Sequence, residues 1–362
     1  QQYMATKEQY KDCILFYRLG DFYEMFFDDA LVASKELEIT LTGKNCGQEE
    51  RAPMCGIPYH AADSYLTKLV NKGYKVAICE QVEDPKLAKG IVKREVIRIV
   101  TPGTNLNMMS LEESRNNYLM CIAYTEDKIG IAVVDALTGD FYVTEVSDTK
   151  KLNDEIVKFS PSEIICNDNF LVSGYSIDDL RERLGISINK IDAWHFEEDS
   201  CQKLLCKHFK VNTLTALGVD DFMAGQIAAG AVLAYLYETQ KNSLSNITHL
   251  NPYIAGKYML LDSATRRNLE LTETLREKQK KGSLLWVLDK TKTAMGARLL
   301  RTYLEQPLIE QADIVLRQEA VGDLLAHPMS REELREYLSP IYDLERLLGK
   351  ISYKTANPRD LI

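Results

Sequence analysis

The chain contains 362 residues, which is too many for one ordinary compact core, so two or three domains are expected. Apolar and charged residues make up 45% and 27% of it, as in soluble globular proteins, and no run of about 18 apolar residues occurs, so a cytoplasmic protein is expected. The net charge of −9 does not exclude DNA as a partner. The acidity is concentrated in residues 106–250, with 12 basic and 22 acidic side chains, whereas residues 1–105 carry 14 and 15.

Strand-like and helical runs alternate over the first hundred residues. Apolar runs predict strands, and segments of helical periodicity predict helices, in this order: strand 13–19, helix 28–39, helix 63–73, strand 74–82 and strand 94–100. The pattern predicts a mixed α/β domain of about a hundred residues, 1–104. The stretch TPGTNLN that follows it contains Pro102, Gly103 and Asn105 and predicts a linker.

The middle of the chain begins with three apolar runs of strand length, residues 118–124, 128–136 and 140–146, separated by turn residues. They predict an antiparallel meander. Helical and strand runs then alternate, which predicts one mixed sheet in an α/β domain over residues 105–243.

The strand signal nearly vanishes after Asp220, and an all-α segment is predicted. Its helical runs are 223–241, 263–275, 283–291, 294–307, 309–327 and 342–352. We assign residues 244–362 to this helical domain. The sequence stops at NPRDLI without a polar tail, and we therefore expect it to be cut from a longer chain.

The segment GDFYEMFFDD, residues 20–29, gathers acids and aromatic rings at a predicted strand-to-helix junction. Asp21 followed three residues later by Glu24 has the pattern of a helix capping box, and the rings would then pack this helix on the sheet. The functional interpretation places Phe22 and Glu24 at the first and third helical positions. Side chains there lean toward the N-terminus, so a ring and a carboxylate would project together and could enter a base stack.

These residues belong to motifs that resemble a known family. LFYRLGDFYEMFFDDA, MCGIPYHAADSYLTKLVNKGYKVAICEQVEDP and VIRIVTPGT closely resemble the mismatch-recognition domain of the MutS family of DNA mismatch repair proteins, and the similarity continues through DSATRRNLEL, MGARLLRTYLEQPL and TANPRDL. The resemblance implies a mixed α/β mismatch-recognition domain, an RNase H-like connector and the start of an α-helical core or lever. It also implies that Phe22 stacks on a mispaired or unpaired base in double-stranded DNA, while Glu24 hydrogen-bonds to that base.

Partners and cofactors follow from the same resemblance. It implies that the connector reaches the partner protein MutL and that the whole family member forms a homodimer. It further implies that ATP and Mg²⁺ are used by a C-terminal domain. The P-loop pattern G-x-x-x-x-G-K-[ST] does not occur in these 362 residues, so the chain itself is expected to have no nucleotide cofactor and no enzymatic activity.

Contacts to the DNA backbone are expected from the first domain. The cationic candidates are Arg51, His60, Lys68 and Lys93. Residues 43–60 are also predicted to form a loop whose backbone amides reach phosphate.

Two alternatives compete with DNA recognition. Asp135 and Asp140, at the end of one predicted strand and the start of the next, lie where ribonuclease H-like nucleases hold Mg²⁺, although no further acidic strand end completes such a site. Cys201, Cys206 and His208 form the tightest group of metal-ligand residue types, yet they lack a second ligand pair at zinc spacing. The remaining cysteines are scattered through apolar runs, so we expect buried free thiols.

Overall fold

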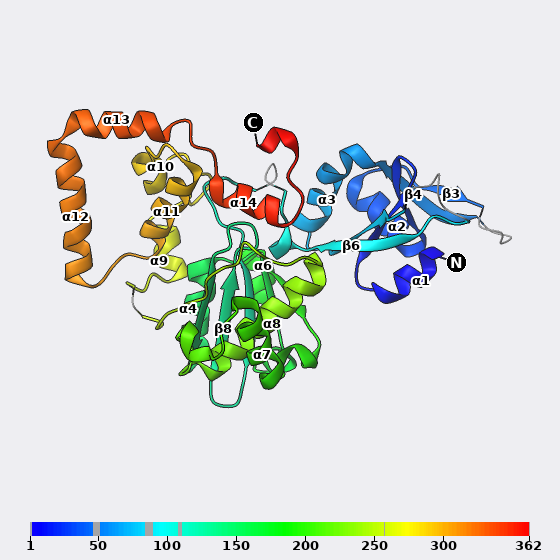
Figure 1. Ribbon diagram of the computed structural model, residues 1–362, viewed down its shortest axis with the longest axis horizontal. Helices are drawn as coiled ribbons and strands as arrows, with labels where there is room; N and C mark the ends of the chain where they lie inside the picture. Colours follow the sequence, from blue (N-terminus) through cyan, green and yellow to red (C-terminus); the bar gives the residue numbers. More distant parts are fainter. Residues whose placement is uncertain (1, 46–50, 84–89, 108–110, 257, 362) are drawn as a thin grey trace. The chain divides into compact units, whose positions relative to one another are not determined.

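The structure is a computed structural model that describes residues 2–45, 51–83, 90–107, 111–256 and 258–361. The chain divides into two compact units, unit 1 with residues 1–110 and 235–243, and unit 2 with residues 111–234 and 244–362 (Figure 1). Within the described ranges, no helix combines the length and the apolar character needed to cross a lipid bilayer.

Unit 1 is built on a six-stranded mixed sheet with the strand order β3-β4-β2-β1-β5-β6. Strands β1 and β5 are parallel, and the other neighbours are antiparallel. Its elements are α1 (Gln2–Gln9), β1 (Ile14–Leu19), β2 (Phe22–Phe26), α2 (Phe27–Leu37), β3 (Thr42–Lys44), β4 (Ala52–Pro58), α3 (Ala62–Asn71), β5 (Val76–Gln81) and β6 (Arg94–Val100). The predicted strands over β1, β5 and β6 and the predicted helices over α2 and α3 are confirmed.

The two faces of this sheet are covered differently. Alternate strand residues, including Phe16, Tyr23 and Met25, form one core with the buried sides of α2 and α3. The opposite face carries a smaller cluster around Leu15 and Tyr17, against which tyrosines of the α1 region pack. Since successive strand side chains point to opposite faces, Phe22 and Glu24 lie on the face opposite to α2 and α3.

The prediction that Phe22 and Glu24 begin a helix is wrong. Residues Phe22–Phe26 form strand β2, and α2 begins only at Phe27, without a side-chain N-cap. The chain changes direction at Phe27, which has a φ of 54°, in the left-handed region that side-chain-bearing residues seldom adopt. The helical face predicted from Ala30, Ala33 and Leu37 is nevertheless buried as expected.

The predicted loop over residues 43–60 is also wrong in its described part. Residues Thr42–Lys44 and Ala52–Pro58 are strands β3 and β4, and β4 pairs with both β2 and β3. Backbone amides of β4 are therefore engaged in the sheet rather than offered to phosphate. Residues 46–50 of this segment lie outside the described residues. The predicted linker around Pro102 contains a buried 3₁₀ turn, Pro102–Thr104, capped by Thr101.

Unit 2 contains a second six-stranded mixed sheet, in the order β11-β10-β7-β8-β9-β12. The predicted meander is confirmed, because β7, β8 and β9 pair antiparallel in sequence order. The α/β part of this unit comprises β7 (Leu119–Tyr124), β8 (Ile129–Val134), β9 (Phe141–Val146), α4 (Thr149–Phe159), β10 (Glu163–Cys166), α5 (Asp168–Leu171), α6 (Ile177–Leu184), β11 (Ser187–Lys190), α7 (Glu198–Phe209), the first part of α8 (Met223–Gln240), up to residue 234, and β12 (Asn251–Pro252).

Helices bury both faces of this sheet, which explains why β8 is apolar at every position. One face packs on apolar residues of α4, α5 and α6. The other approaches α8 so closely that a Cβ placed on Gly130 of β8 would lie 1.8 Å from the carbonyl oxygen of Ala224 in α8. Figure 1 shows β8 in the middle of this part of the chain, with α8 beside it.

The last part of the chain is helical, as predicted, with α9 (Ser263–Asn268), α10 (Leu284–Leu288), α11 (Ala294–Glu305), α12 (Gln311–Ala326), α13 (Pro328–Leu338) and α14 (Leu344–Ser352). Two details differ from the prediction. Helix α9 ends at Asn268 instead of continuing to residue 275, and Glu270, with a φ of 48°, is incompatible with a continuing helix. Helix α13, which begins with Pro328 at its first turn, was not predicted.

Candidate nucleic-acid interface

The Phe22 ring lies exposed at one end of an otherwise well-packed strand. Strand β2 occupies an inner position of the unit 1 sheet, where Phe22 pairs with Leu19 of β1 and with Pro58 of β4. The side chain is 47% exposed, whereas Tyr23 and Met25 beside it are buried in the core. Backbone pairing on both edges fixes the position of Phe22, while its ring remains accessible.

Glu24 lies on the same face, one pleat further along β2. Its neighbour on β4 is Gly56, which carries no side chain. A Cβ at Gly56 would lie 3.7 Å from Cγ of Glu24 and 3.9 Å from Cδ1 of Phe22, so Gly56 adds no side chain to the surface between the acid and the ring. The Glu24 carboxylate accepts a hydrogen bond from Lys44 Nζ of β3 at 2.6 Å.

A cation stacked on an aromatic ring lies at the same end of the sheet. The Arg18 guanidinium carbon is 3.8 Å from the centroid of the exposed Tyr59 ring, and the Arg18 side chain also forms an ion pair with Glu80 at 3.5 Å. Tyr59 directly follows β4, and its amide donates to the Asp21 carbonyl oxygen at 2.9 Å, which ties it to the turn that precedes Phe22. Sequence reasoning missed Arg18, Tyr59 and Gly56, and it treated Lys44 only as one of several basic residues available to the DNA backbone, because only the strand pairing brings these residues to Phe22 and Glu24.

The four predicted cationic candidates do not gather in one place. His60 follows the end of β4 that pairs with Phe22, and its ring contacts Tyr59 edge-on. The registers of β1, β5 and β6 place Lys93, just before β6, at that same end of the sheet. Arg51 precedes β4 and lies at the other end, and Lys68 lies in the second half of α3, which runs away from the Phe22 end.

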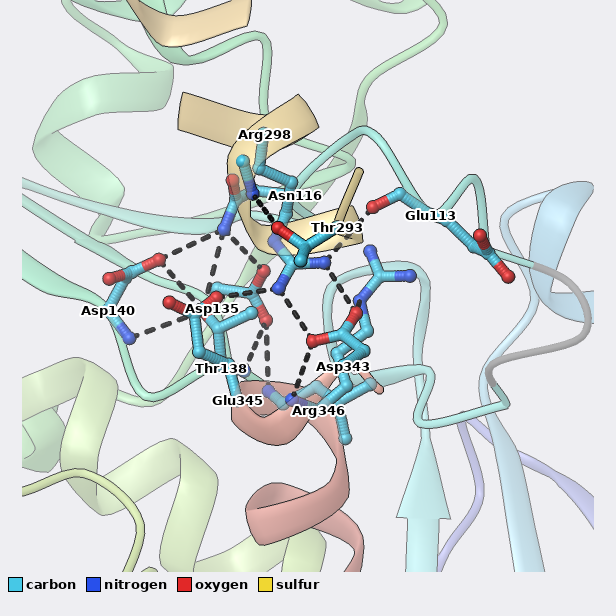
Figure 2. Close-up of polar contacts among 12 residues, drawn as sticks. Glu113, Asn116, Asp135, Thr138, Asp140, Thr293, Arg298, Asp343, Glu345 and Arg346 are labelled. Carbon is cyan, nitrogen blue, oxygen red and sulfur yellow. Dashed lines mark hydrogen bonds and ion pairs between the residues drawn. The ribbon is translucent and has the colours of Figure 1, made fainter. Parts of the chain in front are cut away.

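Asp135 and Asp140, the residues of the nuclease alternative, are used inside the fold of unit 2 (Figure 2). Asp135 is buried, and its two oxygens accept four hydrogen bonds, from Asn116 Nδ2 and from the amides of Asn117, Leu137 and Thr138, at 2.9 to 3.1 Å. Asp140 accepts from the Thr138 hydroxyl at 2.8 Å, and burial together with the charge of Asp135 raises its pKa. A carboxylate whose two oxygens are both occupied by internal donors, as in Asp135, is a poor ligand for Mg²⁺.

The same close-up (Figure 2) shows how α11 is joined to α14, which packs on this turn. Arg298 of α11 forms a bidentate ion pair with Asp343, with Nη–Oδ distances of 2.6 and 2.8 Å, and a further ion pair with Glu345 (Figure 2). A Cβ on Gly349 of α14 would lie 2.0 Å from the Leu137 carbonyl oxygen. The turn between β8 and β9 is therefore a packing surface for the helical part of the unit.

Replacing Asp135 by asparagine is expected to destabilise the protein by about 2 kcal/mol, because an amide NH₂ would face backbone N–H groups that need an acceptor. Urea unfolding followed by circular dichroism measures the change. Asp127→Asn, at an exposed turn, is the matched control and is expected to have little effect. Equal stability of the two variants would contradict a structural role for Asp135.

The candidate metal ligands are engaged separately. Cys201 Sγ contacts the carbonyl oxygen of His195 at 3.1 Å, and His208 Nε2 lies 2.7 Å from the Ile247 carbonyl oxygen. No cluster of three or more His, Cys, Asp or Glu side chains suited to a metal ion occurs in the described part of the chain. Six cysteines are buried free thiols, as predicted, and Cys206 is half-buried. Cys46 lies outside the described residues.

Comparison with known proteins identifies three domain types along the chain. Residues 1–108 match MutS domain I, residues 117–248 match MutS domain II, and residues 264–362 match MutS domain III. Over the whole chain it is 67% identical to the DNA mismatch repair protein MutS of Lachnoclostridium phytofermentans and 54% identical to those of Ruminiclostridium cellulolyticum and Acetivibrio thermocellus. The chain spans 39% to 42% of the length of these relatives.

Proposed function

Because the chain belongs to the MutS family and carries its domains I, II and III, we propose that it recognises mispaired or unpaired bases in double-stranded DNA and thereby takes part in mismatch repair. In this proposal Phe22 stacks on the defective base, and Glu24 accepts a hydrogen bond from it. The observation that carries the proposal is the half-exposed Phe22 ring at a position paired with strands on both sides, next to an acid on the same face.

The energetics of such a site suit a sensor of many defects. Stacking on an aromatic ring contributes about 1–3 kcal/mol per base and is nearly independent of base identity. Insertion between base pairs costs about a few kcal/mol per unstacked step, and less where pairing is already broken. Selectivity then follows from how readily the duplex kinks at the defect.

The remainder of the proposal rests on family membership. Residues 117–248 would act as a noncatalytic, RNase H-like connector that contacts MutL, and residues 264–362 as the first part of an α-helical core. ATP and Mg²⁺ would be used, and the homodimer largely held, by sequence other than these 362 residues, which contain no P-loop motif.

A titration tests the proposed function. Fluorescence anisotropy with the complete protein compares a matched duplex, a G·T mismatch and a duplex with one unpaired base, at one fixed salt concentration. We expect tighter binding to both defective duplexes. Equal affinity for all three would overturn the proposal, and Mg²⁺-dependent cleavage of the labelled strands would favour the nuclease alternative instead.

Replacing Glu24 by alanine is expected to tighten binding to matched duplex by about two- to threefold, because the carboxylate brings negative charge toward phosphates and Lys44 offsets only part of it. The same titration measures the change. Glu36→Ala, which removes an acid paired with Lys72 at 2.7 Å, is the matched control and should leave DNA affinity unaltered. Unchanged or weaker matched-duplex binding by Glu24→Ala would contradict the repulsion.

A further inference from the structure

Glu24 reaches the proposed DNA surface with a cation already attached. Lys44 Nζ lies 2.6 Å from Oε2 of Glu24, and the side chains of Lys44 and Glu24 are 44% and 18% exposed, respectively. The second oxygen, Oε1, has no hydrogen-bond partner within the described ranges. The carboxylate thus has one oxygen held and one available to a new donor.

The sheet register explains how Lys44 reaches an acid two strands away. In the ladder, Lys44 of β3 pairs with Ala52 of β4, while Glu24 of β2 pairs with Gly56, four residues along the same strand. The lysine must therefore cross β4 diagonally, and its ammonium passes the Phe26 ring, 5.5 Å from the ring centroid. Gly56 leaves this route open, because a side chain there would stand beside Glu24.

The charges of this pair bear directly on DNA affinity. A lone carboxylate beside a polyanion raises the free energy of every complex, whether or not the duplex contains a mismatch. An ammonium at hydrogen-bond distance offsets part of that field at the range of a phosphate. It also holds one carboxylate oxygen in place, while the other remains able to accept from a base.

We infer that Lys44 is the positioning residue for Glu24: it neutralises the acid against the phosphates and orients it, so that Oε1 is presented to the base. This inference rests on the proposed function and adds a residue to it. Lys44 acts through Glu24, so its contribution is expected to disappear when the Glu24 charge is removed. A lysine that only contacted phosphate would contribute equally with or without that charge.

A double-mutant cycle separates these cases. The complete protein is prepared as parent, Lys44→Met, Glu24→Gln and the double variant, and each is titrated with matched and G·T-mismatched duplex at fixed salt. We expect Lys44→Met to weaken binding about three- to fivefold more in the parent background than in the Glu24→Gln background, the range in which exposed ion pairs couple. The coupling should be larger on the mismatched duplex, where Glu24 lies against the bases.

Two controls make the cycle specific. Lys44→Arg keeps the positive charge, and its affinity for both duplexes is expected to equal that of the parent. Lys72→Met with Glu36→Gln forms a matched cycle on an ion pair of similar geometry, with a 2.7 Å distance and side-chain exposures of 50% and 23%, and it should show no coupling in DNA affinity.

The possible results have distinct meanings. Equal losses for Lys44→Met in both Glu24 backgrounds, or no loss at all, would overturn the inference while leaving mismatch recognition by the parent intact. A parent that binds matched and mismatched duplex equally would overturn the proposed function itself, whatever the cycle shows.

Discussion

Phe22→Ala is expected to abolish the preference for mismatched over matched duplex. Loss of one base-on-ring stack, about 1–3 kcal/mol, corresponds to a mismatch affinity about five- to 150-fold weaker, while matched binding, which does not use the stack, stays nearly constant. Anisotropy titrations of the complete protein with both duplexes give the ratio. The fold should tolerate the change, because the ring is half-exposed.

The control for Phe22→Ala is Leu31→Ala in α2. Leu31 is also 47% exposed, and it belongs to a helix that packs on the other face of the sheet. Its truncation should leave the affinity ratio at the parental value. A Phe22→Ala protein that still discriminates as the parent does would remove the stacking role from Phe22.

Gly130→Ala is expected to have the largest effect on stability, a loss of about 3 kcal/mol or more. The added methyl carbon would lie 1.8 Å from the Ala224 carbonyl oxygen and 2.8 Å from the Gly225 nitrogen. Because these are backbone atoms, a change of side-chain rotamer cannot relieve the clash, and β8 and α8 must move apart. Thermal and urea unfolding of the chain measure the loss.

Gly322→Ala provides the opposite case. Gly322 lies within α12, and a methyl group on its Cα would meet no heavy atom outside its own helix turn within 4 Å, so alanine should stabilise the helix by about 0.5–1 kcal/mol. If Gly130→Ala and Gly322→Ala unfolded at the same urea concentration, the close packing of β8 on α8 would be refuted.

The parts of the fold that could be predicted are those in which local pattern and tertiary environment agree. Strand β8 is apolar throughout because helices cover both faces, and a continuous apolar run of this length predicts a buried strand. Strand β2 is the opposite case. Asp21 and Glu24 have the spacing of a helix N-terminus, and a helix does follow, but it begins only at Phe27. These residues form a strand because they pair with β4, which lies about thirty residues later in the chain. A prediction from a short stretch of sequence cannot include that partner.

The candidate site was predictable to a similar degree. Phe22 and Glu24 could be named as candidates because the motif around them resembles that of a known family, whereas the argument from helix geometry placed both in the wrong element. The places of Lys44 and Gly56 beside Glu24 could not be predicted, since in the sequence one is an ordinary surface lysine among many basic residues and the other an ordinary glycine. Their importance comes from the register, which sets both against Glu24.

Strand β2 has hydrogen-bonded neighbours on both edges, so the backbone that carries the Phe22 ring is held as firmly as the rest of the sheet. A rigid probe cannot adapt to its target, and the whole deformation must be borne by the nucleic acid. Under the proposed function, the lifetime of each protein–DNA complex then depends on how easily the duplex bends at the bound site. Lesions of unrelated chemistry that soften the double helix equally should be retained for equal times.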